Sequence, residues 1–439
     1  MRLPKFLTGN IVLKITSLNA FVISIRLIVS FFVQRLLASM VGDSGYALVG
    51  QIRNLTAMLT STSTLGVFNG AVKYVSEFRD NKSELQKIFS SVALFILIGS
   101  FVSGGILFFF AEPLSVKIFK DESYHYILKV LAIIVPFIAV NRVFSGVVNG
   151  LSDYKTYAKV ELISYLLSVA ALLYGLLTFN LDGALIAIAI APVIQLVILL
   201  IVFGKTLVVY VQPSKLKLSF IYKNQLLAFT IMSFVSTFLL NFIEIELRNL
   251  ISDEISTGEA GNWTAVMFIS KNYMVFATGL FSLYVIPKFA SIHSKGDFKA
   301  EVFHIYKTIL PIFALGMVIV YLVRNYIISF VYPEFEGMEP LFKWQLLGDF
   351  IRLSALVLAH QFLAKRLVKS FVITEIISLV LFFVLSQLFI QSYGTEGIVI
   401  AHFVRYIIYF IIVAVVVSAY YAKNGAKTED KDEAKNEVT

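Results

Sequence analysis

The sequence contains no cysteine among its 439 residues, which excludes disulfide bonds, thiolate catalysis and cysteine-ligated metal sites. Its five histidines are scattered singly, and neither an HExxH motif nor a paired-histidine spacing indicates a metal centre. The chain also lacks a GxxxxGK[ST] phosphate loop and any long polar segment that could fold as an ATPase. The sequence therefore excludes an ATP-driven engine within the chain, and it predicts neither a metal nor a cofactor.

Charged residues are scarce as well. They make up 15% of the chain, whereas hydrophobic residues make up 58% and the mean hydropathy is +0.83. Soluble proteins are about half apolar and about a quarter charged. Because only a hydrocarbon solvent accepts this much apolar surface, we predict a polytopic membrane protein. The net charge of +9 then reflects membrane topology first, and no nucleic-acid partner is expected.

A window of about 19 residues predicts about twelve transmembrane helices, so the fold class is all-α and polytopic. The predicted spans are 11–38, 47–72, 88–110, 126–148, 157–179, 183–203, 225–250, 262–287, 305–330, 341–364, 370–391 and 397–421. The long connection after the sixth span divides them into six and six. We therefore predict an N-terminal lobe at 1–205, a cytoplasmic linker at 206–223, a C-terminal lobe at 224–421 and a mixed-charge cytoplasmic tail at 422–439.

The two halves also resemble each other weakly. The segment FNGAVKYVSEFRDNKSEL (68–85) aligns with LYVIPKFASIHSKGDFKA (283–300), and each closes a second helix with a cation at its cytoplasmic end. Six helices in each half place the two repeats in the same orientation, about an axis along the membrane normal. Such a pair of lobes leaves a cavity between them, although chance similarity between two amphiphilic loops is the alternative explanation.

Orientation follows from the lysines and arginines, which concentrate in one set of alternate connections and in the tail. The opposite loops hold little more than Lys117 and Lys120. Because cytoplasmic loops carry the excess of cations, we predict that both termini are cytoplasmic.

Ionisable residues inside the predicted spans are candidates for function, because an unpaired charge in hydrocarbon costs several kcal/mol. Arg26 lies near the middle of the first span, too deep for its side chain to reach either surface easily. We favour a role in lining a cavity over a structural ion pair with an acid on another helix. Arg53 lies nearer the non-cytoplasmic side, where reaching the interface is an equal alternative.

The C-terminal half carries further intramembrane charges. Arg248 is a candidate cavity cation, whereas Lys271 is predicted to join a neutralised cluster with Glu244 and Glu246. The segment FKWQLLGDFIRL places Asp349 and Arg352 one turn apart. A proton or sodium site would need a carboxylate, for which Glu244, Asp349 and Glu375 are candidates.

The balance of these charges favours cations. Arginines and lysines in the spans outnumber the acids, and cations in a low-dielectric wall attract an anionic substrate. Arginine suits phosphate in particular, because its planar fork donates two hydrogen bonds to one group. An exporter of cationic drugs is expected to show the reverse excess.

Two segments, FNGAVKYVSEFRDN (68–81) and FKWQLLGD (342–349), resemble the matching segments of Wzx-type flippases, a polysaccharide-transporter branch of the superfamily that also holds the multidrug MATE exporters. The likeness is strongest to the flippases of enterobacterial common antigen and O-antigen units, and it extends over most of the chain. It implies a V-shaped pair of six-helix lobes that carries undecaprenyl-pyrophosphate-linked oligosaccharide from the inner to the outer leaflet of the bacterial cytoplasmic membrane by alternating access.

The resemblance also implies roles for individual residues. Positions where this family tends to hold a cation are Arg26, Arg53, Arg248 and Arg352. Asn69 and Lys73 match the first motif and Asp349 the second, and we include Glu375 with them as motif or coupling candidates. For Asn69 and Gly70 a role in helix packing is the slightly favoured alternative.

The family further implies a polysaccharide polymerase and a chain-length regulator as partners, with membrane lipids around the chain. No enzymatic activity is predicted. The main alternative is a MATE-type drug or cation antiporter, followed by a membrane-embedded glycosyltransferase or polymerase and by a rigid scaffold. The glycan and the driving force stay open.

Overall fold

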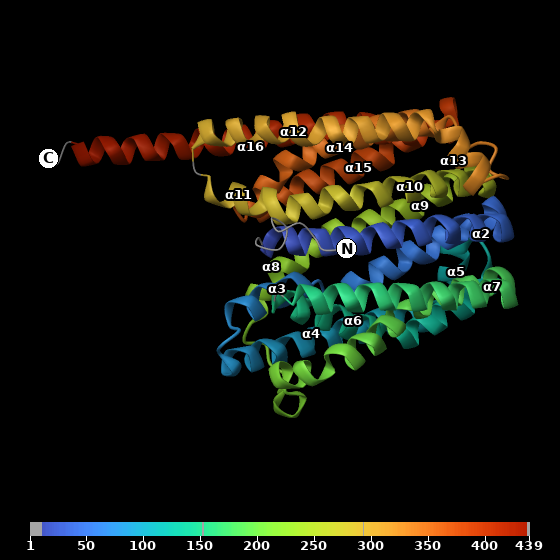
Figure 1. The fold of residues 1–439 in the computed structure, drawn as a ribbon, viewed down its shortest axis with the longest axis horizontal. Coiled ribbons are helices and arrows are strands. Elements are labelled where there is room, and N and C mark those ends of the chain that lie inside the picture. Colours follow the sequence, from blue (N-terminus) through green and yellow to red (C-terminus); the bar gives the residue numbers. More distant parts are fainter. Residues whose placement is uncertain (1–10, 152, 293, 437–439) are drawn as a thin grey trace, which may run out of the picture. The chain divides into compact units, whose positions relative to one another are not determined.

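A computed structural model describes residues 11–151, 153–292 and 294–436, and every regular element in these ranges is a helix (Figure 1). The chain forms two compact units that divide between Asn249 and Leu250. Helices satisfy all their backbone hydrogen bonds internally, which is the requirement that hydrocarbon imposes on a spanning segment. An all-α fold is therefore confirmed, and each unit is described by itself.

Unit 1 begins with α2 (Ile11–Thr62) and the short α3 (Phe68–Glu77). The remaining elements are α4 (Lys82–Phe109), α5 (Ala111–Phe119), η1 (Glu122–Tyr124), α6 (His125–Gly150), α7 (Tyr154–Val211), η2 (Pro213–Lys215), α8 (Lys223–Ser233), the π-helical η3 (Phe234–Leu239) and α9 (Leu240–Glu254), whose last residues belong to unit 2. Side chains cap the N-termini of two long helices. The Asn81 side chain accepts a hydrogen bond from the Glu84 amide of α4 at 3.1 Å, and the Asp153 side chain accepts one from the Thr156 amide of α7 at 3.1 Å.

Two long helices of unit 1 contain a break. In α2 the break is at Gly42, whose φ of 66° is accessible to glycine at little cost. In α7 it is at Phe179 and Asn180, and the two halves then approach so closely that a side chain at Gly175 would meet the backbone of Gly183. Each of these helices therefore supplies two segments. The breaks fall where the sequence predicts a loop between two spans.

The polar segment before α8 is attached to α4. The Lys217 amide donates to Ser90 Oγ at 3.1 Å, and Tyr222 Oη donates to Glu84 Oε2 at 2.5 Å. The hydrogen bond to the Glu84 carboxylate raises the pKa of Tyr222 to about 12, since ionising the phenol would remove its donor and place two negative charges together. These two hydrogen bonds hold the connection before α8 against α4.

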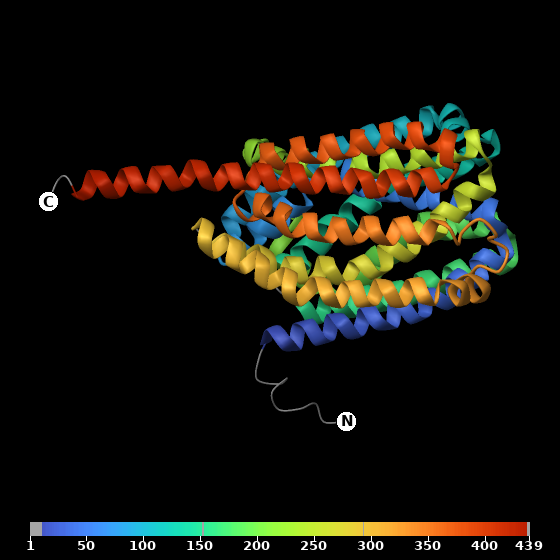
Figure 2. The ribbon, with the colours of Figure 1, turned by 90° about the horizontal axis from the view of Figure 1, so that it is seen from above.

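Unit 2 contains α10 (Thr257–Leu280), the π-helical η4 (Phe281–Val285), α11 (Ile286–Ser291), α12 (Lys295–Leu322), α13 (Arg324–Val331), α14 (Leu341–Ala364), α15 (Val368–Tyr393) and α16 (Glu396–Asn436). Its best-packed helix is α14, which contacts α10, α12, α15 and α16. At Gly348 the backbone of α16 is so near that an added Cβ would lie 3.2 Å from Phe403 Cα. Figure 2 shows α16, in red, continuing well past the other helices of this unit.

Nine helical stretches within the described residues are long and apolar enough to cross a membrane. Two of them, Val22–Thr62 and Lys155–Val211, are 41 and 57 residues long and contain the breaks described above. About 20 residues suffice for one crossing, so each of these two stretches can supply two. The chain is a multi-pass membrane protein, and the count of twelve spans stays a prediction.

Some predicted boundaries are wrong. The second predicted span, 47–72, is interrupted because α2 ends at Thr62, where Leu65 and Gly66 adopt positive φ before α3 begins. The ninth, 305–330, is likewise divided at Val323 between α12 and α13. Both breaks lie beside polar residues, Ser63 and Thr64 in the first segment and Arg324 and Asn325 in the second, but a hydropathy window averages these short polar stretches with the apolar residues on either side. The predicted division into lobes at 206–223 stays a prediction, and the compact units divide 26 residues later.

Candidate functional site

The first candidate site is built around Arg26 on α2. Arg26 Nη1 forms an ion pair with Glu161 Oε2 at 3.1 Å, and its guanidinium lies 5.0 Å from the ring centroid of Tyr165. Glu161 and Tyr165 are one turn apart on α7, so they present one face to α2. Tyr165 Oη also donates to the Arg26 carbonyl at 3.0 Å. We name these residues and the two polar side chains described next the Arg26 cluster.

The acid of this cluster is itself held in place. Gln195 Nε2 donates to Glu161 Oε1 at 2.6 Å, and Asn141 Nδ2 on α6 donates to Gln195 Oε1 at 2.9 Å. The Arg26 side chain is nevertheless 42% exposed, against 21% for Glu161. The ion pair with an acid on another helix is therefore present, and the role of Arg26 in lining a cavity stays a prediction. Its guanidinium keeps donors available for an anionic group.

A second polar cluster of unit 1 surrounds Arg248 on α9. Arg248 Nη1 donates to Gln51 Oε1 at 2.8 Å, and the Gln51 amide donates in turn to Asn249 Oδ1 at 2.8 Å. Asn54 Nδ2 donates to Glu244 Oε2 at 2.9 Å. Only 3% of Arg248 is exposed, and the hydrogen-bond partner described above, Gln51, belongs to the same unit. Its assignment to a substrate cavity stays a prediction.

The other predicted residues of unit 1 are less informative. Arg53 is half-buried on α2. Lys73 on α3 lies 3.8 Å from Glu77 one turn away and 4.7 Å from the Tyr74 ring centroid. Asn69 lies on the same helix, and its side chain falls outside the described part of the structure. The neighbouring Gly70 packs against Leu226 and Phe229 of α8, which supports the packing role weighed for this motif.

The predicted cluster of Lys271 with two glutamates stays a prediction, because Lys271 belongs to unit 2 and both glutamates belong to unit 1. Within unit 1 Glu246 Oε1 has another partner, the Lys117 ammonium of α5 at 3.3 Å.

In unit 2 the strongest concentration of polar side chains surrounds Asp349 on α14, which is completely buried. Its Oδ2 accepts from Ser270 Oγ at 2.5 Å, from Gln345 Nε2 at 3.1 Å and from Tyr273 Oη, and its Oδ1 accepts from His402 Nε2 at 3.1 Å. Arg352 Nη1 is more distant, at 3.9 Å. We name these six residues the Asp349 cluster.

The histidine of this cluster supplies one donor. His402 is 3% exposed, and its Nδ1 has no hydrogen-bond partner among the described residues. A neutral imidazole with its proton on Nε2 satisfies this geometry, because a charged ring would bury a second, unsatisfied N–H. The cluster thus balances a buried carboxylate with neutral donors and the nearby Arg352 guanidinium.

Glu375 on α15 accepts a hydrogen bond from Tyr409 Oη at 2.5 Å. Beside it, Arg405 Nε donates to Ser378 Oγ at 3.0 Å, and the Arg405 guanidinium lies 4.4 Å from the Tyr406 ring centroid. Sequence reasoning placed Asp349 and Arg352 together but missed Ser270 and Tyr273, which come from a different helix. Ser270 and Tyr273 are three residues apart on α10, and such a pair carries no signal of its own.

Comparison with solved structures identifies the fold. An inward-facing multidrug resistance MATE family transporter of the MOP superfamily matches with a TM-score of 0.73 and 15% identity, over 90% of this chain and 95% of that chain. The lipid II flippase MurJ in an inward closed conformation matches with a TM-score of 0.61 and 15% identity, over 92% and 87%. The fold is that of a MOP-type membrane transporter.

Sequence comparison identifies the family. The profile of the polysaccharide biosynthesis protein family matches residues 12–293, and the chain belongs to this family. The lipid III flippase of Escherichia coli (strain K12) is 28% identical over 384 residues, covering 86% of this chain and 91% of that protein. The lipid III flippase of Shigella flexneri matches to the same extent. The resemblance recognised in the two sequence motifs is therefore confirmed.

Proposed function

We propose that this protein is a flippase for polyprenyl-pyrophosphate-linked oligosaccharide, which it moves from the cytoplasmic to the periplasmic leaflet of the inner membrane for surface polysaccharide assembly. Membership of the polysaccharide biosynthesis family and the relationship to lipid III flippases over most of their length support this reaction. The undecaprenyl carrier, with a common-antigen or O-antigen repeat unit, is the substrate class that these relatives favour.

The structural observation that carries the proposal is the half-exposed Arg26 within an apolar helix. A guanidinium held by Glu161 and Tyr165 is already oriented, so binding an anion costs little further side-chain entropy. Its remaining N–H groups suit the oxygens of a pyrophosphate, to which arginine can donate two parallel hydrogen bonds. We propose Arg53, Arg248 and Arg352 as further cations along the path of the substrate.

Alternating access between an N-terminal and a C-terminal lobe, with both termini cytoplasmic, completes the proposed mechanism. The glycan would occupy the aqueous space between the lobes while the polyprenyl chain stays in the bilayer. The protein's part is binding and conformational change rather than covalent chemistry. A polysaccharide polymerase and a chain-length regulator are proposed to take the product onward.

Coupling to an ion gradient would require a carboxylate that changes its protonation or ligand during the cycle. We propose Asp349 first, because four neutral donors and Arg352 surround it in a fully buried position. Glu375 is the second candidate, and Asn69 with Lys73 are proposed to move with α3 during the cycle.

The test is mass spectrometry of lipid-linked intermediates from cells depleted of this protein. We expect one undecaprenyl-pyrophosphate glycan to accumulate, with a mass that identifies the repeat unit, and restored expression should clear it. A membrane-impermeant reagent that modifies the glycan then reports its leaflet. Accumulation on the periplasmic side would contradict transport and would indicate a block in a later step.

The MATE-type antiporter is the alternative, and the same cells distinguish it. If no lipid-linked glycan accumulates and the cells retain more cationic dye, the protein exports cations. In that case substitution of Asp349 should abolish dye export, whereas substitution of Arg26 should leave it unchanged.

A further inference from the structure

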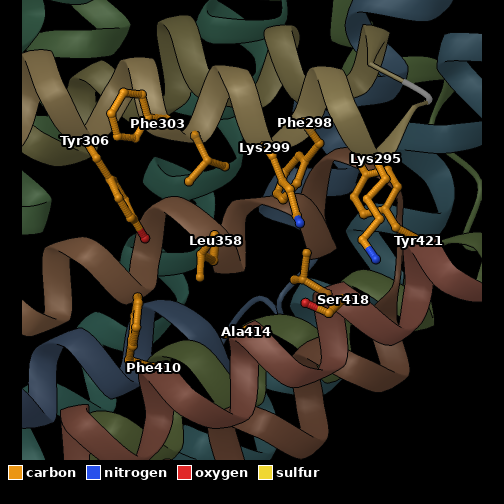
Figure 3. A pocket seen from close by; sticks show the side chains of 12 residues that line it. Lys295, Phe298, Lys299, Phe303, Tyr306, Leu358, Phe410, Ala414, Ser418 and Tyr421 are labelled. Carbon is orange, nitrogen blue, oxygen red and sulfur yellow. The ribbon is translucent and has the colours of Figure 1, made fainter.

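Unit 2 contains a slot of about 330 Å³ between α12, α14 and α16, which the proposed transport cycle does not use. Figure 3 shows the side chains that line it. Lys295, Lys299 and Ser418 lie toward one end, and Phe303, Tyr306 and Phe410 lie toward the other. The slot therefore has a cationic end and an apolar end.

The two lysines are arranged to receive a ligand at the cationic end. They are four residues apart, so they lie on one face of α12, and Figure 3 shows both side chains directed toward α16. Both side chains are exposed, and among the described residues neither ammonium forms an ion pair or a hydrogen bond. Two adjacent cations without a protein partner repel each other, and an anion between them removes that cost.

The acids of the same region are engaged elsewhere. Asp297, in the first turn of α12, accepts from Ser294 Oγ at 2.7 Å. Glu301 accepts from Tyr284 Oη at 2.7 Å and lies 3.8 Å from the Lys288 ammonium. Within the described part of the chain, neither of these two acids forms an ion pair with Lys295 or Lys299.

The two tyrosine hydroxyls that line the slot are hydrogen-bonded within the protein. Tyr306 Oη donates to the Ser354 carbonyl at 2.8 Å, and Tyr421 Oη accepts from Gln361 Nε2 at 2.7 Å. The rings of Phe298 and Tyr421 pack with their centroids 4.8 Å apart. With these hydroxyls already satisfied inside the protein, the slot suits a hydrocarbon chain rather than a sugar.

The length of the slot matches one leaflet. Eleven residues of helix separate Lys295 from Tyr306, which corresponds to about 16 Å along α12. The hydrocarbon core of a bilayer is about 30 Å thick, so one leaflet contributes about 15 Å. A chain anchored at the lysines would thus fill the slot without crossing to the other leaflet.

We propose that this slot binds an acidic glycerophospholipid of the cytoplasmic leaflet, with its phosphate between Lys295 and Lys299 and one acyl chain along Phe303, Leu358 and Phe410. Basic pockets between transmembrane helices on the cytoplasmic side are a recognised means of binding such headgroups. The polyprenyl chain of a transported glycan is much longer than this slot. The site therefore serves a resident lipid that stabilises unit 2, and it is independent of the proposed cargo.

The experiment is native mass spectrometry of the full chain purified in detergent and titrated with phosphatidylglycerol or phosphatidylcholine. We expect the protein to retain phosphatidylglycerol in preference to phosphatidylcholine. The double variant K295Q/K299Q should bind it about 25-fold more weakly, since each surface lysine contributes about fivefold. K307Q, an exposed lysine three turns along the same helix, is the matched control and should bind normally.

A second variant tests the apolar part of the slot. A414F places a ring where the acyl chain is proposed to lie and should weaken phosphatidylglycerol binding although both lysines remain. K295R/K299R keeps both positive charges and should therefore bind phosphatidylglycerol, unlike K295Q/K299Q. Melting temperatures show whether each variant is folded. Equal binding of the two phospholipids, unchanged binding by K295Q/K299Q, or retention of a polyprenyl phosphate instead would each overturn the proposal. None of these results depends on transport activity.

Discussion

The Arg26 cluster of unit 1 and the Asp349 cluster of unit 2 solve the same problem, a charge within an apolar fold, in opposite ways. Arg26 shares its charge with one acid and stays 42% exposed. Asp349 is fully buried and gathers hydrogen bonds from four side chains. The first arrangement leaves donors for a ligand, whereas the second leaves the acid no contact with solvent. The two clusters therefore differ in the accessibility of the charge rather than in its presence.

The largest effect is expected at the buried acid. Asp349→Ala leaves Ser270, Tyr273, Gln345 and His402 without their common acceptor, and breaking a buried, hydrogen-bonded charge costs about 3–5 kcal/mol. We expect a large fall in melting temperature of the purified protein. Asp349→Asn keeps the shape and one acceptor and should cost less, and the exposed Asp80→Asn is the control. A normal melting temperature for D349A would mean that the cluster does not stabilise unit 2.

The next effect is expected at the exposed cation, and it should appear in transport. Arg26→Ala removes charge-assisted hydrogen bonds worth about 1.5–3 kcal/mol, or about 10- to 150-fold in substrate binding. The fold should survive, because partly exposed ion pairs contribute about 0–1 kcal/mol to stability. Accumulation of the lipid-linked glycan in cells carrying the variant is the measurement, and the exposed Arg79→Ala is the control. Normal transport by well-expressed R26A would remove Arg26 from the site.

A smaller effect is expected at the partner of that cation. Glu161→Gln keeps a hydrogen-bonding side chain beside Arg26 and Gln195 but removes the competing negative charge. If Arg26 binds substrate, E161Q should lose less than about tenfold in transport and therefore far less than R26A. If the two residues form only a structural pair, E161Q and R26A should be equally impaired. The double variant R26A/E161Q then measures their coupling.

The smallest effect is expected outside the membrane, at the connection before α8. Tyr222→Phe removes one hydrogen bond to Glu84, worth about 1 kcal/mol or less at a partly exposed site. Because folding raises the pKa of Tyr222 to about 12, this contribution is complete below pH 10 and is lost as the pH rises through about 12. Limited proteolysis of residues 212–222 should therefore be equally slow at pH 7 and pH 9 in the native protein. Y222F should be cut faster at both values.

Several parts of the fold could be predicted from the sequence because they depend on local composition. The span 341–364 coincides with α14, since an apolar run of that length leaves the backbone no alternative to helix in hydrocarbon. The breaks near Gly42 and Asn180 were also predictable from loop composition between apolar runs. The turn after Thr62 was not, because the short polar run at 60–64 is averaged with the apolar residues on both sides of it in a hydropathy window.

The candidate sites were predictable only in part. Deep charges such as Arg26 and Asp349 stand out in any apolar segment, and the two motifs pointed to the family that the comparisons confirm. Their partners did not stand out. Glu161 is 135 residues from Arg26, and His402 is 53 residues from Asp349. No periodicity links such positions.

The sequence by itself thus determined a multi-pass helical membrane protein of the polysaccharide biosynthesis family with a surplus of deep cations, because hydropathy and motif are properties of neighbouring residues. Only the tertiary structure decided which charges are enclosed and which are accessible. A buried arginine lowers or raises the stability of the folded protein according to the side chains that surround it. Those side chains are brought together by the packing of helices that are far apart in the chain.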